Sequence, residues 1–208
     1  MYVEYCLYNK YIEDYTIEIK EIFSAIDAGI NGIAVPIHLL RKIKTFMPND
    51  IALATAIDYP LGYSSSKIKI SATLDSVKSG ASAIDYVANS FFLKNDFPKL
   101  EHEIKNCIGI CKDYGASFRI FLEYNRSNLK DLIPIVKMYY KFGADACFPT
   151  VGYHHDDFTD NIINGKVLEQ ETDMPIIFNG FLWKQDQLTK VVENNFFGIR
   201  LYNLNFLV

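Results

Sequence analysis

The stretch that decides the fold is Ile51–Asn89, which reads IALATAIDYPLGYSSSKIKISATLDSVKSGASAIDYVAN. Its first apolar run ends at Asp58. Pro60 and Gly62 then predict a turn, and the serines Ser64–Ser66 that follow can each cap the start of a helix. The beginning of the stretch therefore predicts a buried strand, a turn and a helix.

The second half of the same stretch predicts the end of that helix and another strand. Gly80 is typical of the residue that follows a helix, and the apolar run Ser82–Ala88 comes directly after it. A strand–helix–strand unit of this kind belongs to a parallel sheet. Asp58 and Asp85 are acids in strands that should be apolar, so both need a functional or structural reason.

The remaining sequence repeats this rhythm, with glycines at the joints where helices lead into strands, as in KSGAS, DYGAS and KFGAD. We expect eight strands alternating with seven helices, which is typical of a (β/α)8 TIM barrel in the α/β class. A doubly wound sheet is the alternative, but the chain has no G-x-G-x-x-G motif. The predicted strands are Tyr2–Leu7, Gly32–Val35, Ile51–Ile57, Ser82–Ala88, Ser117–Glu123, Ala144–Thr150, Met174–Phe178 and Phe196–Leu201.

Length and composition fit one domain that spans residues 1–208. Half of the residues are hydrophobic, and the net charge of −4 comes without a basic patch, so we expect no nucleic-acid partner. The longest apolar runs have the length of strands, so we expect no membrane association. No signal peptide is evident, and the scattered cysteines predict reduced thiols in a cytoplasmic protein; they are Cys6, Cys107, Cys111 and Cys147.

Charged and polar residues mark the predicted carboxyl ends of the strands, where TIM-barrel sites lie. The two-residue period of a strand places Asp85 with Asn89, and Arg119 with Glu123, on one face each. With Glu4, these charges could form a buried ion network, or they could line a polar ligand site at the barrel mouth. The other candidate ligand-binding positions at strand ends are Asp58, Thr150, Gly152, Asn179, Gly180 and Arg200.

Two possible metal motifs have simpler interpretations. His154, His155, Asp156 and Asp157 follow the sixth strand, but adjacent residues seldom bind one ion, so a loop and a helix cap are expected there. Cys107 and Cys111 share a helix face without further ligands at finger-like spacing, so we expect them in the core. The sequence therefore predicts no metal and no cofactor.

The whole chain resembles the deoxyribose-phosphate aldolase family from about Glu4 to Asn203. The family's G-F-P-x-G exit from the third strand is similar to D-Y-P-L-G here, and its fourth-strand motif G-A-D-E-[IV]-D-x-V-x-N is similar to G-A-S-A-I-D-Y-V-A-N. Its fifth strand, L-K-V-I-x-E-T, resembles F-R-I-F-L-E-Y. The resemblance implies a TIM barrel. It also implies the activity of that family, whose enzymes split 2-deoxyribose 5-phosphate into acetaldehyde and glyceraldehyde 3-phosphate.

The catalytic part of the resemblance is broken. The family's Schiff-base lysine lies in K-T-S-T-G on strand six, where this chain reads F-P-T-V-G with Phe148 in the lysine's place. Its second lysine, in K-P-A-G-G on strand seven, aligns with Ile176. The strand-five lysine becomes Arg119, whose guanidinium stays protonated and cannot form a Schiff base. Only the strand-four aspartate carries over, as Asp85.

The phosphate-binding turns of the family are also altered. The family holds phosphate on backbone amides after strands seven and eight, using small residues, whereas this chain has Asn179 and Gly180 after strand seven and Tyr202 after strand eight. Arg200 stands near a position that the family also fills with arginine.

Two functions remain open from the sequence. In the first, an aldolase-like barrel binds a small phosphorylated or carbonyl compound without the Schiff-base reaction, with Asp85 as a proton-transfer group, Arg119 as anion holder and Glu123 as its catalytic partner. In the second, the barrel is inactive and serves as a binding or structural subunit.

The end of the sequence predicts assembly with another chain. Only Tyr202–Val208 follows the eighth strand, so the eighth helix should be truncated. The apolar residues Leu204, Phe206, Leu207 and Val208 should then lie at an incompletely covered seam. We therefore expect a homo-oligomer or a complex with another protein that covers this seam.

Overall fold

The structure, a computed structural model, describes residues 1–8, 10, 15–124, 127–153 and 157–207. Eight parallel strands form one sheet in the order β6-β5-β4-β3-β2-β1-β8-β7. A parallel bridge between Cys147 and Ile176 joins the two ends of this order, so the sheet is nearly closed into a barrel. The strands are β1 (Tyr2–Cys6), β2 (Gly32–Ala34), β3 (Ala52–Ile57), β4 (Ala83–Val87), β5 (Ser117–Phe121), β6 (Ala146–Phe148), β7 (Ile177–Phe178) and β8 (Gly198–Leu201).

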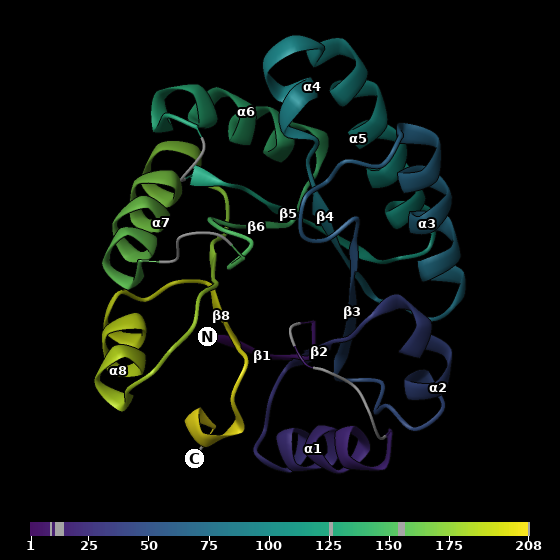
Figure 1. The fold of residues 1–208 in the computed structure, drawn as a ribbon, viewed down its shortest axis with the longest axis vertical. Helices are drawn as coiled ribbons and strands as arrows, with labels where there is room; N and C mark the ends of the chain where they lie inside the picture. The colour runs from purple at the N-terminus through teal and green to yellow at the C-terminus, as the bar shows by residue number, and fades with distance from the viewer. Residues whose placement is uncertain (9, 11–14, 125–126, 154–156, 208) are drawn as a thin grey trace.

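Helices surround this barrel, as Figure 1 shows. The predicted (β/α)8 fold is confirmed, with short additional helical turns after β2 and β4. The helices are α1 (Tyr15–Asp27), η1 (Ile37–Leu39), α2 (Leu40–Lys44), α3 (Ser66–Lys78), α4 (Ser90–Asn95), α5 (Phe97–Asp113), α6 (Leu129–Phe142), α7 (Phe158–Thr172), α8 (Gln185–Glu193) and η3 (Leu204–Phe206).

The turn between β3 and α3 forms where the sequence predicted it, but by a different contact. Ser65 is the N-cap residue of α3, yet its side chain makes no capping hydrogen bond. Instead, the Asp58 carboxylate accepts hydrogen bonds from Ser64 N at 2.6 Å and Ser64 Oγ at 2.7 Å. Gly62 is required in this turn, because its φ is +72° and an added Cβ would lie 2.6 Å from the carbonyl oxygen of Ala88.

After β8 the chain forms only the single turn η3, between α1 and α8 in Figure 1. Leu204, Phe206 and Leu207 are partly buried against the main hydrophobic core. Val208, which the sequence also assigned to the seam, lies outside the described residues.

The core has an outer and an inner part, because side chains of a strand alternate between the helices and the barrel interior. Most apolar residues pack between sheet and helices, whereas Val87, Phe121, Phe148 and Ile177 belong to a separate cluster inside the barrel. The four cysteines are free thiols and all are buried, and Cys107 and Cys111 lie in the outer core as predicted.

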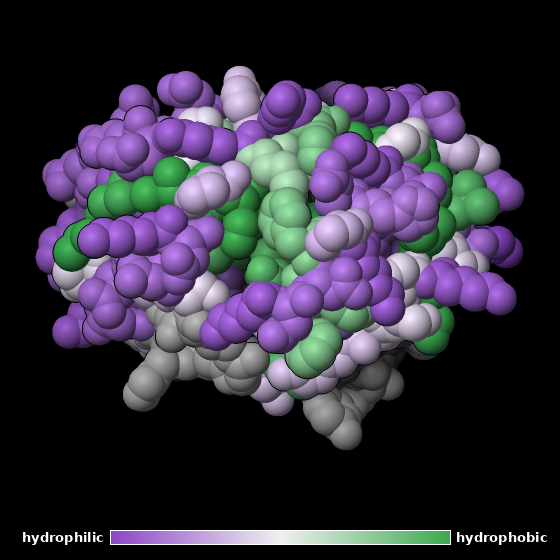
Figure 2. All heavy atoms as spheres, turned by 90° about the horizontal axis from the view of Figure 1, so that it is seen from above, coloured by the Kyte–Doolittle hydropathy of each residue, from purple (hydrophilic) through white to green (hydrophobic). Residues whose placement is uncertain are grey.

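The outer surface is mixed in character. Figure 2 shows the face presented by α4, α5 and α6, where hydrophilic side chains surround an apolar band. No helix in the described part of the chain is both long and apolar enough to cross a membrane.

Candidate functional site

Four charged side chains from four strands meet inside the barrel and form an ion-pair ring, defined here as Glu4, Asp85, Arg119 and Arg200. Arg119 Nε donates to Asp85 Oδ1 at 2.7 Å, and its Nη1 donates to Glu4 Oε2 at 2.7 Å. Arg200 Nε donates to Glu4 Oε1 at 2.7 Å, and its Nη2 contacts both Glu4 and Asp85. All four are buried, so two positive charges balance two negative ones without bulk water.

Two tyrosines complete the bonding of the two carboxylates. Tyr2 Oη donates to Glu4 Oε2 at 2.8 Å, and Tyr8 Oη donates to Asp85 Oδ2 at 2.8 Å. Burial alone would raise the pKa of Glu4, but the guanidinium groups of Arg119 and Arg200 outweigh it and lower that pKa to about 2. Glu4 is therefore held as a carboxylate at neutral pH.

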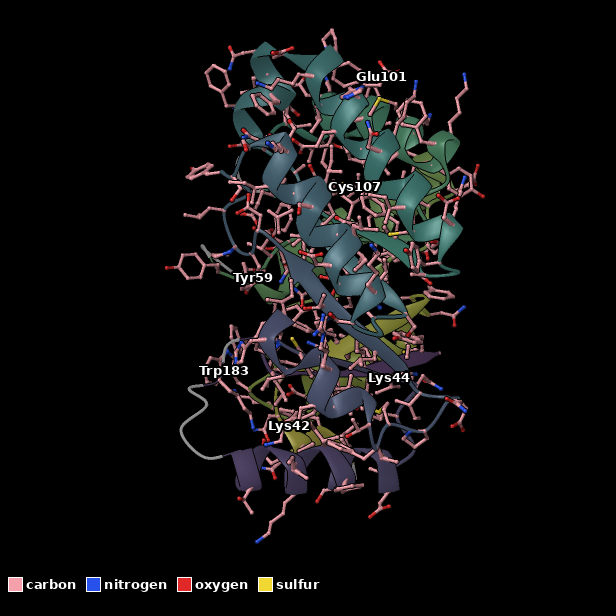
Figure 3. All side chains as sticks on the ribbon, turned by 90° about the vertical axis from the view of Figure 1, so that its right-hand side faces the viewer. Lys42, Lys44, Tyr59, Glu101, Cys107 and Trp183 are labelled. Atoms are coloured by element: carbon pink, nitrogen blue, oxygen red, sulfur yellow. The ribbon has the colours of Figure 1, made fainter. Side chains whose placement is uncertain are left out.

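Aromatic rings cover the ion-pair ring on the side of the carboxyl ends of the strands. The guanidinium carbon of Arg200 lies 4.1 Å from the centre of the Phe148 ring, which stacks on Phe121 at 4.5 Å between centroids. Tyr59 crosses above them, since its hydroxyl donates to the carbonyl oxygen of Val151 at 2.9 Å and its ring contacts those of Tyr8 and Phe121. Figure 3 places Tyr59 on the same side of the molecule as Trp183, in the loop after β7.

Phe148 and Ile176, which the family resemblance aligns with lysines, face different layers of the barrel. Phe148 belongs to the cluster inside the barrel. Ile176 packs in the outer core, whereas its neighbour Ile177 faces the interior, and the alignment of Ile176 with the second lysine stays a prediction. No lysine lies in any of the eight described strands.

Glu123 does not join the ion-pair ring, and this corrects the expected grouping with Arg119. β5 ends at Phe121, so the two-residue alternation no longer applies at position 123. Glu123 Oε1 instead accepts from Val151 N at 2.7 Å and Thr150 Oγ1 at 3.4 Å. The sequence grouped Glu123 with Glu4, Asp85 and Arg119, but in the structure Arg200 is the fourth member of the ion-pair ring.

The side chains of Asp58 and Asn89 accept hydrogen bonds from backbone amides that follow β3 and β4. Asp58 bonds to the Ser64 turn and lies 3.7 Å from Lys69 Nζ. Asn89 Oδ1 accepts from Phe91 N at 2.9 Å and from Phe92 N at 3.3 Å, so it caps α4 and does not share the interior with Asp85.

Thr150, Gly152 and Asn179 are brought together, largely by bonds to one another. Asn179 Nδ2 donates to the carbonyl oxygen of Thr150 at 2.8 Å, and Gly152 N donates to Thr150 Oγ1 at 3.0 Å. Tyr202 Oη donates to Asn179 Oδ1 at 2.8 Å. These contacts tie the loops after β6, β7 and β8 into one unit.

Two of the cavities at the carboxyl ends of the strands are lined by predicted ligand-binding residues. The smaller, of about 230 Å³, is lined by Tyr8, Pro36, Ile37, Ala56, Asp58 and Tyr59. The larger, of about 450 Å³, lies between the loop after β7 and the η3 segment and includes Gly180. Of the predicted ligand positions, Asp58 and Gly180 therefore line open space, whereas the ion-pair ring lies beneath aromatic side chains.

A second group of buried polar residues lies in the helix layer, and the sequence did not predict it. Lys69 Nζ is fully buried, donates to the carbonyl oxygen of Val87 at 2.9 Å and lies 3.4 Å from Glu103 Oε1. Burial lowers the pKa of Lys69, although Glu103 and Asp58 act to raise it. A lysine on a helix normally suggests an exposed side chain, so only its place in the family motif could have drawn attention to it.

The loop after β6 can be described only in part. Asp157 caps α7 by accepting from Asp160 N at 2.9 Å, as predicted, while His154, His155 and Asp156 lie outside the described residues. Within the ranges that are described, no three histidine, cysteine or acidic side chains converge as a metal site would require.

Comparison with known proteins shows which solved structures share this fold. No protein-family model matches the chain. Its fold matches that of QR15, an aldolase, with a TM-score of 0.84 and 15% identity, covering 97% of this chain and 89% of the other. The tetrameric deoxyribose phosphate aldolase from Aeropyrum pernix matches with a TM-score of 0.80 and 19% identity, covering 95% and 84%. At these identities, the likenesses show a shared barrel fold.

Sequence comparison then specifies the resemblance. The deoxyribose-phosphate aldolases of Streptococcus agalactiae and Streptococcus pyogenes are 28% identical to this chain over 120 residues, which cover 57% of the chain. The match spans about half (53%) of the length of these curated relatives. The resemblance inferred from the sequence motifs is confirmed: the chain is similar in sequence to deoxyribose-phosphate aldolases over these 120 residues, and its fold is similar to that of aldolase barrels.

Proposed function

We propose that this barrel binds a small sugar phosphate or carbonyl compound at the carboxyl ends of its strands and does not carry out Schiff-base aldol cleavage. The observation that supports this proposal is the content of the barrel interior. Phe148 stacks on Phe121 above a neutral ion-pair ring, and no described lysine reaches that interior. Schiff-base formation requires a desolvated amine that can be neutral near pH 7 and that contacts the carbonyl.

The test combines trapping with turnover. The purified protein is treated with borohydride in the presence of 2-deoxyribose 5-phosphate or acetaldehyde, and a coupled aldehyde assay follows cleavage. We expect no covalent adduct and no lysine-dependent turnover, together with a rise in melting temperature when a ligand is present. An adduct mapped to a lysine, or cleavage at a rate typical of an aldolase, would contradict the proposal.

The variant Phe148→Lys sharpens this test. A single lysine would enter an interior that already holds the two guanidinium groups of Arg119 and Arg200, and no second lysine would accompany it. We expect Phe148→Lys to remain inactive on 2-deoxyribose 5-phosphate. Recovery of turnover by this one change would show that the rest of the aldolase machinery is intact.

A second candidate function, as a binding or structural subunit, is favoured by exposed apolar side chains around the barrel mouth. Five segments that follow strands each present one, with exposed fractions of 44% for Ile37, 60% for Tyr63, 62% for Phe91, 61% for Tyr153 and 78% for Trp183. Such side chains are typical of interaction surfaces. Oligomerisation of this chain stays a prediction, to be tested by light scattering at micromolar concentration, where a monomer would contradict it.

A further inference from the structure

We propose that the 450 Å³ cavity between the loop after β7 and the η3 segment binds an uncharged, hydroxyl-bearing ring, such as a free sugar or the sugar of a nucleoside, and not a phosphate group. This inference rests on the proposed ligand-binding function and, at this cavity, replaces the sugar phosphate of that proposal with an unphosphorylated sugar. The lining residues used below are Lys10, Glu21, Phe181, Trp183, Tyr202, Asn203 and Asn205.

Three backbone amides in these two turns, those of Trp183, Lys184 and Asn205, already have side-chain partners. Gln187 Oε1 accepts from both Trp183 N, at 2.7 Å, and Lys184 N, at 3.1 Å, so the start of α8 is capped by its own side chain. In the η3 turn, Asn203 Oδ1 accepts from Asn205 N at 3.0 Å. A phosphate would have to break these bonds before it could use the positive end of α8.

The charges around the cavity are also balanced. Lys10 forms an ion pair with Glu21, and both line the cavity. Arg200, the nearest arginine along the chain, is buried in the ion-pair ring with Glu4 and Asp85. A doubly charged phosphate would therefore meet no uncompensated cation among the described lining residues, and its desolvation would not be offset.

Aromatic side chains line the cavity, and a sugar ring can pack its face against them. The rings of Phe181 and Tyr202 lie 4.9 Å apart with an interplanar angle of 30°, and the Trp183 ring continues this series 6.1 Å from Phe181. Trp183 is largely exposed, so its indole face is available to a ligand. The carboxamides of Asn203 and Asn205 lie on the same cavity and can bond hydroxyl groups.

The experiment uses the single tryptophan of the chain, Trp183, as the reporter. The full-length protein is titrated with 2-deoxyribose, thymidine, 2-deoxyribose 5-phosphate and inorganic phosphate, while tryptophan emission and the melting temperature are recorded. We expect 2-deoxyribose or thymidine to change the emission. We also expect 2-deoxyribose 5-phosphate to bind no more than about threefold tighter than 2-deoxyribose, and phosphate alone to have no effect. A preference for thymidine would identify a nucleoside, and equal binding would identify the free sugar.

Variants locate the site. Trp183→Ala should weaken 2-deoxyribose binding at least tenfold by calorimetry, while Tyr114→Ala, which removes an exposed ring at the end of α5, should leave it unchanged. Binding of 2-deoxyribose 5-phosphate tenfold or more tighter than 2-deoxyribose would overturn this inference and leave the proposed function standing. Equal binding by the wild type and Trp183→Ala would also overturn it. No binding of any of these compounds would overturn both.

Discussion

Two regions of this molecule bury charged side chains, and they do so in different ways. In the barrel interior, each carboxylate of the ion-pair ring bonds to both guanidinium groups and to a tyrosine hydroxyl. In the helix layer, Lys69 of α3 lies 3.4 Å from Glu103 of α5, whose two carboxylate oxygens make no hydrogen bond within the described residues. The nearby Tyr139 hydroxyl likewise has none there.

The comparison shows that burial alone does not make a charged group stabilising. Removing charges from water costs several kcal/mol per ion, and the cost is offset only where geometry and hydrogen bonding are good. The ion-pair ring meets this condition more fully than the Lys69–Glu103 pair, because every carboxylate oxygen of the ring is hydrogen-bonded, although Arg119 Nη2 and Arg200 Nη1 make no hydrogen bond within the described residues. We therefore expect the two regions to respond differently to the same kind of substitution.

The largest effect is expected for Arg200→Ala. This change leaves Glu4 and Asp85 buried with one guanidinium between them, so the free energy of unfolding should fall by about 3–5 kcal/mol. Urea unfolding followed by circular dichroism measures it. The matched control is Arg41→Ala, which removes an exposed arginine and should cost less than about 0.5 kcal/mol. Equal effects of the two variants would show that the ring does not stabilise the barrel.

The acid response of the ion-pair ring is the next largest effect. The pKa of Glu4 in the folded protein is about 2, below its ordinary value of 4.5, so Glu4 contributes stability above pH 4.5 that is lost as the pH falls toward 2. With about 1.4 kcal/mol for each pKa unit, the loss by pH 2 should be about 3 kcal/mol. Glu4→Gln should be less stable at pH 7 and should lose less stability on acidification. Parallel acid curves for the two proteins would contradict this assignment.

Much of the fold could be predicted from the sequence, because glycine joints and apolar runs report directly on backbone periodicity. The eight predicted strands are all present, and Gly143 ends α6 with a φ of +100°, as its position after the helix predicted. The inward orientation of Asp85 and Arg119 also followed from strand periodicity. These features depend on local spacing, which a single sequence records.

The site was harder to predict, because it depends on where each strand ends and on partners far apart in the sequence. Glu123 was misplaced by extending β5 two residues too far. Asp58 bonds to the Ser64 backbone, a contact that its position at a turn favours, while its assignment as a ligand-binding residue stays a prediction. The contact of Arg200 with Glu4 joins residues at opposite ends of the chain, and no spacing rule reveals it.

Paired substitutions test the comparison directly. Lys69→Met combined with Glu103→Leu removes an ion pair with incomplete hydrogen bonding, so the free energy of unfolding should change by less than about 1 kcal/mol or rise. Glu4→Leu combined with Arg200→Leu also removes one charge of each sign, but it breaks several good hydrogen bonds and should cost about 2 kcal/mol more. Denaturant curves of both double variants measure the difference. A greater loss in the helix layer than in the barrel would reverse our ranking.

The smallest effect is expected in the alkaline range and concerns Lys69 alone. Burial lowers the pKa of Lys69 in the folded protein, despite the opposing effect of Glu103 and Asp58, so the unfolded chain binds this proton more tightly. Stability linked to Lys69 should therefore rise as the pH increases toward 10.5, the ordinary pKa of lysine, and should fall as the pH decreases through the lowered value. The wild type should gain stability relative to Lys69→Met between pH 8 and pH 10, by less than the acid effect of Glu4. The control is Lys67→Met, at a neighbouring exposed position on α3. The wild type should gain no such stability relative to this control variant. If the wild type instead lost stability relative to Lys69→Met over this range, Glu103 and Asp58 would hold Lys69 as a firm cation, and the two buried regions would be alike.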